Sequence, residues 1–205
     1  MAGEIAAILL AAGESRRMGQ PKLLLPWGQT TVLGRVVAMF AAADIEDILV
    51  VTGGAHEQVE RLVADLAKEY PVRAVFNPEY ARGEMLSSIQ TGFSNLGSAP
   101  RAALIGLGDQ PQVLEATIRA ICSAYFRTEA PLVFPSFKNR RGHPWLASRP
   151  FWADILALPQ STNPRHFISN YTGRIEYVDA DASILQDLDT PEDYNRQRPG
   201  TLFTK

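Results

Sequence analysis

Residues 5–22 read IAAILLAAGESRRMGQPK, a short apolar run that leads directly into a turn of small and charged residues. The nearly continuous apolar character of residues 5–10 is typical of a strand that is covered on both faces. After Leu10, the small residues Ala11, Ala12 and Gly13 would let a ligand lie close to the backbone. Because open α/β sheets bind ligands outside the carboxyl ends of their strands, we expect a binding loop here.

The same turn carries three cations within seven positions, Arg16, Arg17 and Lys22. Successive N–H groups in such a turn form an anion-binding concavity, Arg supplies forked donors for phosphate oxygens, and Lys supplies a compact charge. Two common phosphate-binding motifs do not fit, because Gly13 lacks a partner at G-x-G-x-x-G spacing and Gly19 is not followed by Lys. A solvated basic turn is the alternative, but the position after a buried strand favours an anion site.

Four further apolar runs predict buried strands, at residues 48–52, 72–76, 102–107 and 132–134. Apolar side chains at helical spacing lie between them, at residues 33–40, 59–66 and 114–125. This alternation predicts an α/β fold with a mostly parallel central sheet and helices on both faces. We expect a single domain over residues 1–195, with an irregular, proline-rich stretch at residues 135–164, and a tail at residues 196–205.

The composition is that of an ordinary globular protein, with 46% hydrophobic and 20% charged residues among 205. The formal net charge of −2 argues against a general nucleic-acid binder, which is normally more basic. A single cysteine, Cys122, excludes an internal disulfide and a zinc site with several thiolates. The apolar run at residues 5–12 is too short to span a bilayer and lacks the flanks of a signal peptide. We therefore expect a cytoplasmic protein with no nucleic-acid or membrane partner.

Residues 10–26 read LAAGESRRMGQPKLLLP and resemble the signature of the nucleotidylyltransferase superfamily. More narrowly, they resemble the MocA-like molybdopterin cytidylyltransferases. The resemblance continues at GDQP (residues 108–111), GHP (142–144) and DLDTPED (187–193), and so covers nearly the whole chain. It implies a three-layer Rossmann-like nucleotidylyltransferase fold. It also implies that Arg16, Lys22 and backbone amides hold a nucleoside triphosphate.

Asp109 follows the predicted strand at residues 102–107 and is expected at the carboxyl edge of the sheet, beside the first loop. A carboxylate there suits Mg²⁺, which prefers one or two carboxylates together with phosphate oxygens and water. The alternative is a helix N-cap, because the Gln-Pro sequence that follows is typical of a first helical turn. The resemblance implies that Asp109 is a metal ligand.

The acidic run at residues 187–193 has two interpretations of its own. Thr190 or Asp189 could cap a helix that starts at Pro191, with further carboxylates in its first turn. The resemblance instead implies that Asp189 is the second metal ligand, with Asp187 as an outer or alternative ligand. The expected metal is Mg²⁺, with Mn²⁺ as a replacement.

Two further segments follow predicted strand ends. Gly53 comes after the second strand and Asn77 after the third, with Ser87 and Ser88 shortly beyond. Glycines and small hydroxyl residues at such ends can approach a base and a ribose, although an ordinary first helical turn is an equal interpretation of the two serines. The resemblance implies that these residues line a nucleotide pocket together with residues 10–13.

A lone histidine, His143, lies in the segment RRGHP at residues 140–144. A structural hydrogen-bonding role is favoured for it. The alternative is a position near the second substrate, with Arg140 or Arg141 facing phosphate. No local pattern suggests a Ser–His–Asp or Cys–His arrangement.

The resemblance implies transfer of CMP from CTP to a phosphorylated pterin acceptor, with Lys22, Arg16 and Asp109 as catalytic residues. A molybdoenzyme that receives the product is a further partner in this interpretation. A phosphomonoester nucleophile, with its second pKa at about 6, is largely deprotonated at neutral pH and needs no general base. The alternatives are a nucleotidylyltransferase for a sugar or polyol phosphate, and a non-catalytic molybdenum cofactor-binding chaperone.

Ala12 is expected to influence which nucleobase the site accepts. The guanylyl-transferring branch of the superfamily typically has glycine at this position. One Cβ packed against the edge of a base can exclude a two-ring base, so Ala12 predicts a preference for cytosine over guanine.

Overall fold

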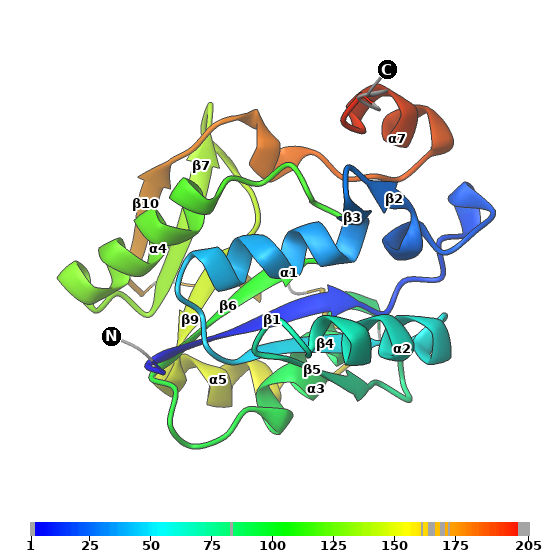
Figure 1. The fold of residues 1–205 in the computed structure, drawn as a ribbon. Helices are drawn as coiled ribbons and strands as arrows, with labels where there is room; N and C mark the ends of the chain where they lie inside the picture. The colour runs from blue at the N-terminus through cyan, green and yellow to red at the C-terminus, as the bar shows by residue number, and fades with distance from the viewer. Residues whose placement is uncertain are drawn as a thin grey trace.

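The computed structural model of the protein describes residues 3–82, 84–160, 162–163, 167–168, 171 and 173–200. A central sheet has the strand order β10-β7-β9-β6-β1-β4-β5, with β8 paired to β7 beside this path (Figure 1). The strands of this sheet are β1 (Ile5–Ala11), β4 (Ile48–Thr52), β5 (Val72–Phe76), β6 (Ala102–Leu107), β7 (Leu132–Phe137), β8 (Arg140–Arg141), β9 (Trp145–Ser148) and β10 (Ile175–Asp179). The α-helices are α1 (Val32–Ala42), α2 (His56–Leu66), α3 (Glu84–Asn95), α4 (Glu115–Thr128), α5 (Arg149–Leu156) and α7 (Pro191–Gln197).

Most strand pairs are parallel. Strand β1 runs parallel to both β4 and β6, β4 to β5, and β7 to β10. Strand β9 is antiparallel to β6 and β7, and the short strand β8 is antiparallel to β7. The prediction of a mostly parallel central sheet is confirmed.

The pleat of β1 explains why both faces of the sheet are covered. Ala7 and Leu9 belong to the apolar core beneath α1, α2 and α4, whereas Ala6 and Ile8 belong to the core beneath α3 and α5. Because successive side chains of a strand point to opposite faces, a continuous apolar run requires a helix layer on each side. The two helix layers are visible above and below the sheet in Figure 1, which confirms the three-layer fold.

Helix α3 approaches β1 closely through a glycine. A Cβ placed on Gly92 would lie 2.5 Å from Cγ2 of Ile8, so a larger residue there would push the helix away from the sheet. This close packing fixes the distance of α3 from the sheet. It therefore also helps to position the first turn of α3, which carries Ser87 and Ser88.

The central-sheet strands of the first half of the chain were predicted to within a residue. The prediction for the second half missed several elements. The strand at residues 132–134 extends to Phe137, and the irregular stretch at residues 135–164 contains β8, β9 and α5. Strand β10 reads IEYVD and lies at the sheet edge, where Glu176 pairs with Arg127 and Asp179 is exposed, so it lacks a continuous apolar run. The predicted domain end at residue 195 falls within α7.

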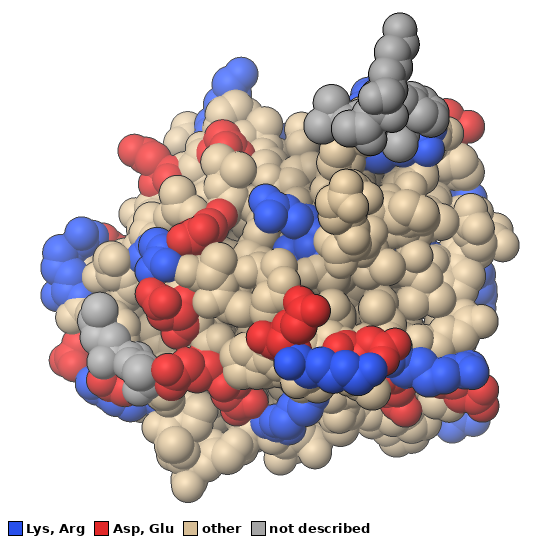
Figure 2. All heavy atoms as spheres, in the orientation of Figure 1, with Lys and Arg blue, Asp and Glu red and all other residues tan. Residues whose placement is uncertain are grey.

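Charges of both signs are interspersed on the face that Figure 2 shows. Several of them form pairs, such as Arg61 with Glu57 on α2, and Arg119 of α4 with Glu115 and Asp44. Within the described residues, no helix is both long and apolar enough to cross a membrane.

Candidate active site

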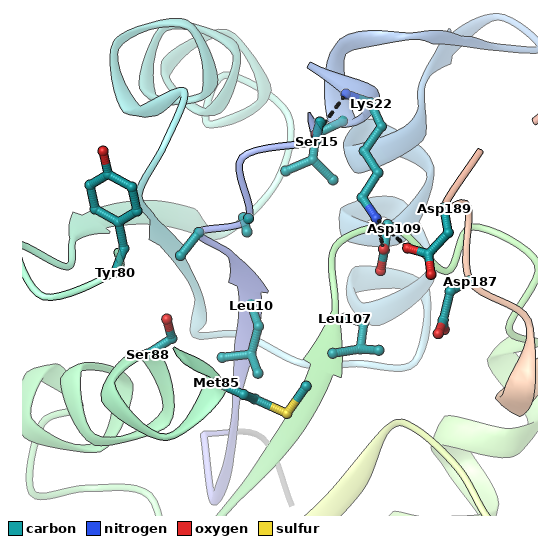
Figure 3. Close-up of a pocket in the computed structure, with 14 residues that line it drawn as sticks. Leu10, Ser15, Lys22, Tyr80, Met85, Ser88, Leu107, Asp109, Asp187 and Asp189 are labelled. Atoms are coloured by element: carbon teal, nitrogen blue, oxygen red, sulfur yellow. Dashed lines mark hydrogen bonds and ion pairs between the residues drawn. The ribbon is translucent and has the colours of Figure 1, made fainter. Parts of the chain in front are cut away.

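The parallel strands β1, β4, β5 and β6 end at one edge of the sheet, and a pocket of about 340 Å³ opens there (Figure 3). Lys22, Asp109 and Asp189 lie on one side of this pocket, and Tyr80 and Ser88 lie on the other. The pocket is lined by nine of the residues that the sequence analysis named for a site: Leu10, Ala11, Ala12, Gly13, Lys22, Ser88, Asp109, Asp187 and Asp189.

The loop after β1 is shaped by Ser15. This residue adopts a left-handed backbone conformation with φ of 51°, and its Oγ accepts a hydrogen bond of 3.2 Å from the backbone N–H of Lys22. The bond closes the loop around one short 3-10 turn, η1 (Arg16–Met18), and a second, η2 (Lys22–Leu24), begins at Lys22. The sequence did not predict a structural role for Ser15, although its position inside the motif at residues 10–26 was a signal for one.

The ammonium group of Lys22 bridges two carboxylates. Its Nζ donates to Oδ2 of Asp109 and, at 3.3 Å, to Oδ1 of Asp189. The side chains of Lys22 and Asp109 are only 14% and 15% exposed, so this pair lies at the inner wall of the pocket. Burial acts to lower the pKa of Lys22, but the charges and hydrogen bonds of Asp109 and then Asp189 outweigh it and raise that pKa above its ordinary value.

The two arginines of the turn point in different directions. Arg17 forms an ion pair of 2.8 Å with Asp189 at the outer rim of the cluster. Arg16 is 81% exposed and pairs with Glu14 instead, and it is not among the residues that line the pocket. The expectation that Arg16 faces the site therefore does not match this structure, in which Arg17 is the arginine bonded to the acidic cluster.

Asp187 lies in the same wall but has a different partner. Its Oδ1 accepts a hydrogen bond of 2.7 Å from Nε2 of Gln110, which is itself buried. Burial, and after it repulsion from Asp109, raises the pKa of Asp187, although the bond from Gln110 acts in the opposite direction. Asp187 is thus held apart from the bridge made by Lys22.

Helix capping does not account for the two predicted metal ligands. The N-cap of α4 is Leu114, so Asp109 does not cap that helix. At α7, Thr190 is the N-cap: its Oγ1 accepts from the N–H of Asp193, and the Asp193 carboxylate accepts from the N–H of Thr190. This capping box leaves Asp189 free to point toward Lys22.

A divalent cation fits the chemistry of this donor set. Among the described residues, no group of three His, Cys, Asp or Glu side chains is arranged as a complete metal site. Two carboxylates nevertheless converge on one cationic atom, Nζ of Lys22, which acts as a stand-in cation. Mg²⁺ and similar ions take only one or two protein carboxylates when phosphate oxygens and water supply the rest.

The opposite side of the pocket rests on a buried amide. Asn77 is only 1% exposed, and its Nδ2 donates to Ser87 Oγ at 2.9 Å and to Ser88 Oγ at 3.1 Å. Its Oδ1 accepts from the backbone N–H of Glu79 at 3.0 Å. Asn77 therefore ties the end of β5 to the first turns of α3. Of these three polar side chains only Ser88 lines the pocket.

Gly53 supports the first loop from behind. A Cβ added to it would lie 2.5 Å from the carbonyl oxygen of Ala12, and the N–H of the neighbouring Gly54 donates to that oxygen at 3.1 Å. The lining residues include Ala12 but not Gly53. In this structure Gly53 permits close packing of two loops, whereas the sequence had suggested direct contact with a nucleotide.

Further lining residues include Tyr80, which had no sequence signal apart from its position, and Met85, which belongs to the same stretch as the two serines that the resemblance implied. Tyr80 follows β5, and Met85 lies in the first turn of α3 on the apolar floor between the two sides of the pocket. His143 makes the contacts expected of a structural residue, because its Nδ1 lies 3.3 Å from the carbonyl oxygen of Ile105 and its N–H donates to that of Ile184. Arg141 bonds the hydroxyl of Tyr177 on β10.

Comparisons with known proteins agree with this geometry. The chain is 30% identical over 193 residues to the molybdenum cofactor cytidylyltransferase of Escherichia coli (strain K12), with 93% of each chain covered. A crystal structure of Rv0371c from Mycobacterium tuberculosis H37Rv superimposes with a TM-score of 0.81 at 26% identity, covering 96% of this chain and 98% of that one. Another crystal structure of that protein is a complex with manganese, with a TM-score of 0.76 at 25% identity and the same coverage.

A nucleotidyl transferase from Methanothermobacter thermautotroptrophicus also shares the fold, with a TM-score of 0.78, 26% identity and 95% of each chain covered. Residues 7–175 match the family model of the MobA-like NTP transferase domain. That match spans most of the chain and includes the first loop and Asp109. The chain therefore belongs to the MobA-like NTP transferase family and is a nucleotidyltransferase.

Proposed function

We propose that this protein transfers CMP from CTP to the phosphate of molybdopterin or the molybdenum cofactor and releases pyrophosphate. The observation that carries the proposal is the bridge of Lys22 between Asp109 and Asp189, at one side of a pocket whose other side suits a base and ribose. The similarity to the cytidylyltransferase of Escherichia coli supports the choice of CTP and of a molybdenum cofactor acceptor.

The triphosphate would lie across the loop after β1. Gly13 and the residues before it expose backbone close to the pocket, and Lys22 provides the buried positive charge beside them. Arg17, at the rim, adds a second cation for phosphate oxygens. Such a site acts by positioning and by electrostatic stabilisation of the charge that develops on the phosphates.

Asp109 and Asp189 would hold a divalent cation, Mg²⁺ or Mn²⁺, which neutralises charge on the reacting phosphates when it is bound. The nucleophile is an oxygen of the acceptor phosphate, which forms a bond to the α-phosphorus while the bond to the pyrophosphate oxygen breaks. Because that oxygen already lacks a proton near neutral pH, no side chain has to remove one. This agrees with a pocket whose lining contains no histidine among the described residues.

The test is a product assay with purified protein, each of the four nucleoside triphosphates, Mg²⁺ or Mn²⁺, and molybdenum cofactor. We expect pyrophosphate release and a cytosine dinucleotide product, identified by mass spectrometry, with CTP preferred. The Asp109→Asn variant is the matched control. A guanine product would refute the choice of CTP, and transfer only to a sugar or polyol phosphate would refute the pterin acceptor. Tight cofactor binding without any turnover would indicate the chaperone alternative.

A further inference from the structure

Lys22 is bonded to the two carboxylates that the proposed function requires for the metal, so it cannot serve the triphosphate and the aspartates at once. We propose that Lys22 holds the place of the divalent cation in the nucleotide-free protein, and that its side chain leaves this place when a triphosphate binds. Metal and nucleotide then enter together. This inference rests on the proposed assignment of Asp109 and Asp189 as ligands.

Repulsion between Asp109 and Asp189 is offset by Lys22. Asp109 and Asp189 come from distant parts of the chain, yet both lie within bonding reach of one nitrogen atom. Two carboxylates this close, one of them only 15% exposed, repel each other unless a cation lies between them. Lys22 supplies that cation, so an entering metal ion has to compete with a charge that is already in place.

The ammonium group of Lys22 can move without the backbone. The backbone of Lys22 is fixed, because its N–H is bonded to Ser15 Oγ. The side chain is a flexible four-carbon stem with a rotatable ammonium group. Lys22 and the exposed backbone of Gly13 line the same pocket, so phosphate oxygens on this loop offer the ammonium new acceptors. Rotation of one side chain is therefore sufficient, and no loop has to open.

The consequence is a coupling between two ligands. A triphosphate that draws Lys22 away raises the affinity of the aspartates for metal, and a metal that displaces Lys22 raises the affinity for the triphosphate by the same factor. In the absence of nucleotide, metal binding is weak because Lys22 competes for the same oxygens.

Arg17 provides a matched control within the same cluster. It also carries a positive charge bonded to Asp189, at 2.8 Å, but it is 69% exposed and contacts only one of the two aspartates. Loss of Arg17 therefore changes the net charge of the site by the same amount as loss of Lys22. It leaves the bridge between the carboxylates intact.

The experiment is a titration of nucleotide-free protein with Mn²⁺, followed by the electron paramagnetic resonance signal of the free ion. We expect Lys22→Met to bind Mn²⁺ about ten- to a hundredfold more tightly than the native protein, the scale of one charge-assisted hydrogen bond lost by the competitor. Arg17→Met is expected to change the affinity by about threefold or less, as is usual for an exposed pair. Adding Asp109→Asn to Lys22→Met should abolish the gain.

Thermal unfolding gives an independent readout. Without metal, Lys22→Met leaves Asp109 without the ammonium group and Asp189 with Arg17 alone, and should have a lowered Tm. Mn²⁺ should raise that Tm more than it raises the Tm of the native protein. If Lys22→Met does not fold without metal, Lys22→Gln, which keeps a hydrogen-bond donor, is measured in its place. Unchanged or weaker Mn²⁺ binding in the Lys22 variant, or no binding in either protein, would overturn the proposal. Neither nucleotide nor acceptor is present in these measurements, so their failure is distinct from a failure to transfer CMP.

Discussion

At one side of the pocket, Lys22 forms ion pairs with Asp109 and Asp189, and all three side chains border the cavity, whereas at the other side Asn77 is buried with its amide fully engaged. The first group can exchange its partners for a ligand without breaking the fold. The second cannot, because its partners are the strand end and the helix that it joins. Some polar residues of the site are therefore expected to take part in the reaction, and others stabilise the fold around it.

The largest effect is expected on the charged side of the pocket, which is formed by Lys22, Asp109 and Asp189. Lys22→Ala should lower turnover at saturating CTP by about 10²–10³-fold, because a preorganised electrostatic contact is lost where charge develops. The measurement is steady-state turnover, with circular dichroism to show that the variant is folded. Near-normal turnover in a folded variant would remove Lys22 from the catalytic group.

Asp189 and Asp187 should differ in how much their substitution lowers turnover. Asp189→Asn should lower turnover by about 10²-fold and weaken the dependence on metal, because Asp189 shares the Lys22 bridge. Asp187→Asn should cost less than about tenfold, because Asp187 is bonded to Gln110 instead. A silent Asp189→Asn with an inactive Asp187→Asn would place the metal ligand two residues earlier in the chain.

On the buried side, the expected effect is on stability. Asn77→Ala removes the amide that bonds Ser87, Ser88 and the backbone of Glu79, and should lower the free energy of unfolding by about 2–3 kcal/mol. Urea denaturation measures this change. The turnover of the folded fraction should stay within about threefold of the native value. A loss of activity without a loss of stability would instead mean that Asn77 contacts the substrate.

The smallest expected effect concerns base choice at the loop between the two sides. Ala12→Gly removes the methyl group of a residue that lines the pocket, and this methyl group lies close to Gly53. One methyl-sized change in a pocket is worth about 1–3 kcal/mol, so the ratio of kcat/KM for CTP over GTP should fall about tenfold without inverting fully. The hypothesis fails if the native protein prefers GTP, or if the ratio does not move in a folded variant.

The fold was predictable where local pattern and burial agree. Strands β1, β4, β5 and β6 are continuous apolar runs because both faces are covered, and their bounds followed from the sequence to within a residue. Strand β9 is only four residues long and antiparallel, and β10 carries charges at the sheet edge. Neither has the pattern of a buried parallel strand, so tertiary context decides their structure.

Within the site, the sequence was informative about which residues matter and less so about which way they point. Arg16 and Arg17 are neighbours in one turn that follows the left-handed residue Ser15, yet Arg17 bonds Asp189 whereas Arg16 pairs with Glu14. Gly53 satisfies two requirements that the sequence cannot distinguish, room for a ligand and room for another loop. The bridge between Lys22 and Asp109 joins residues 87 positions apart. The sequence placed Asp109 beside the first loop, but it did not predict that the two side chains bond each other.

The contrast between the two sides is tested most directly by measuring turnover at saturating CTP and the free energy of unfolding side by side for Asp109→Asn and Asn77→Ala. We expect Asp109→Asn to lose at least about 10²-fold in turnover while its stability changes little, since Asn keeps the size of the side chain and can still accept from Lys22. We expect Asn77→Ala to show the reverse, a clear loss of stability with turnover nearly retained. Near-normal turnover of Asp109→Asn, with its fold intact, would contradict the assignment of the charged side as the centre of the chemistry.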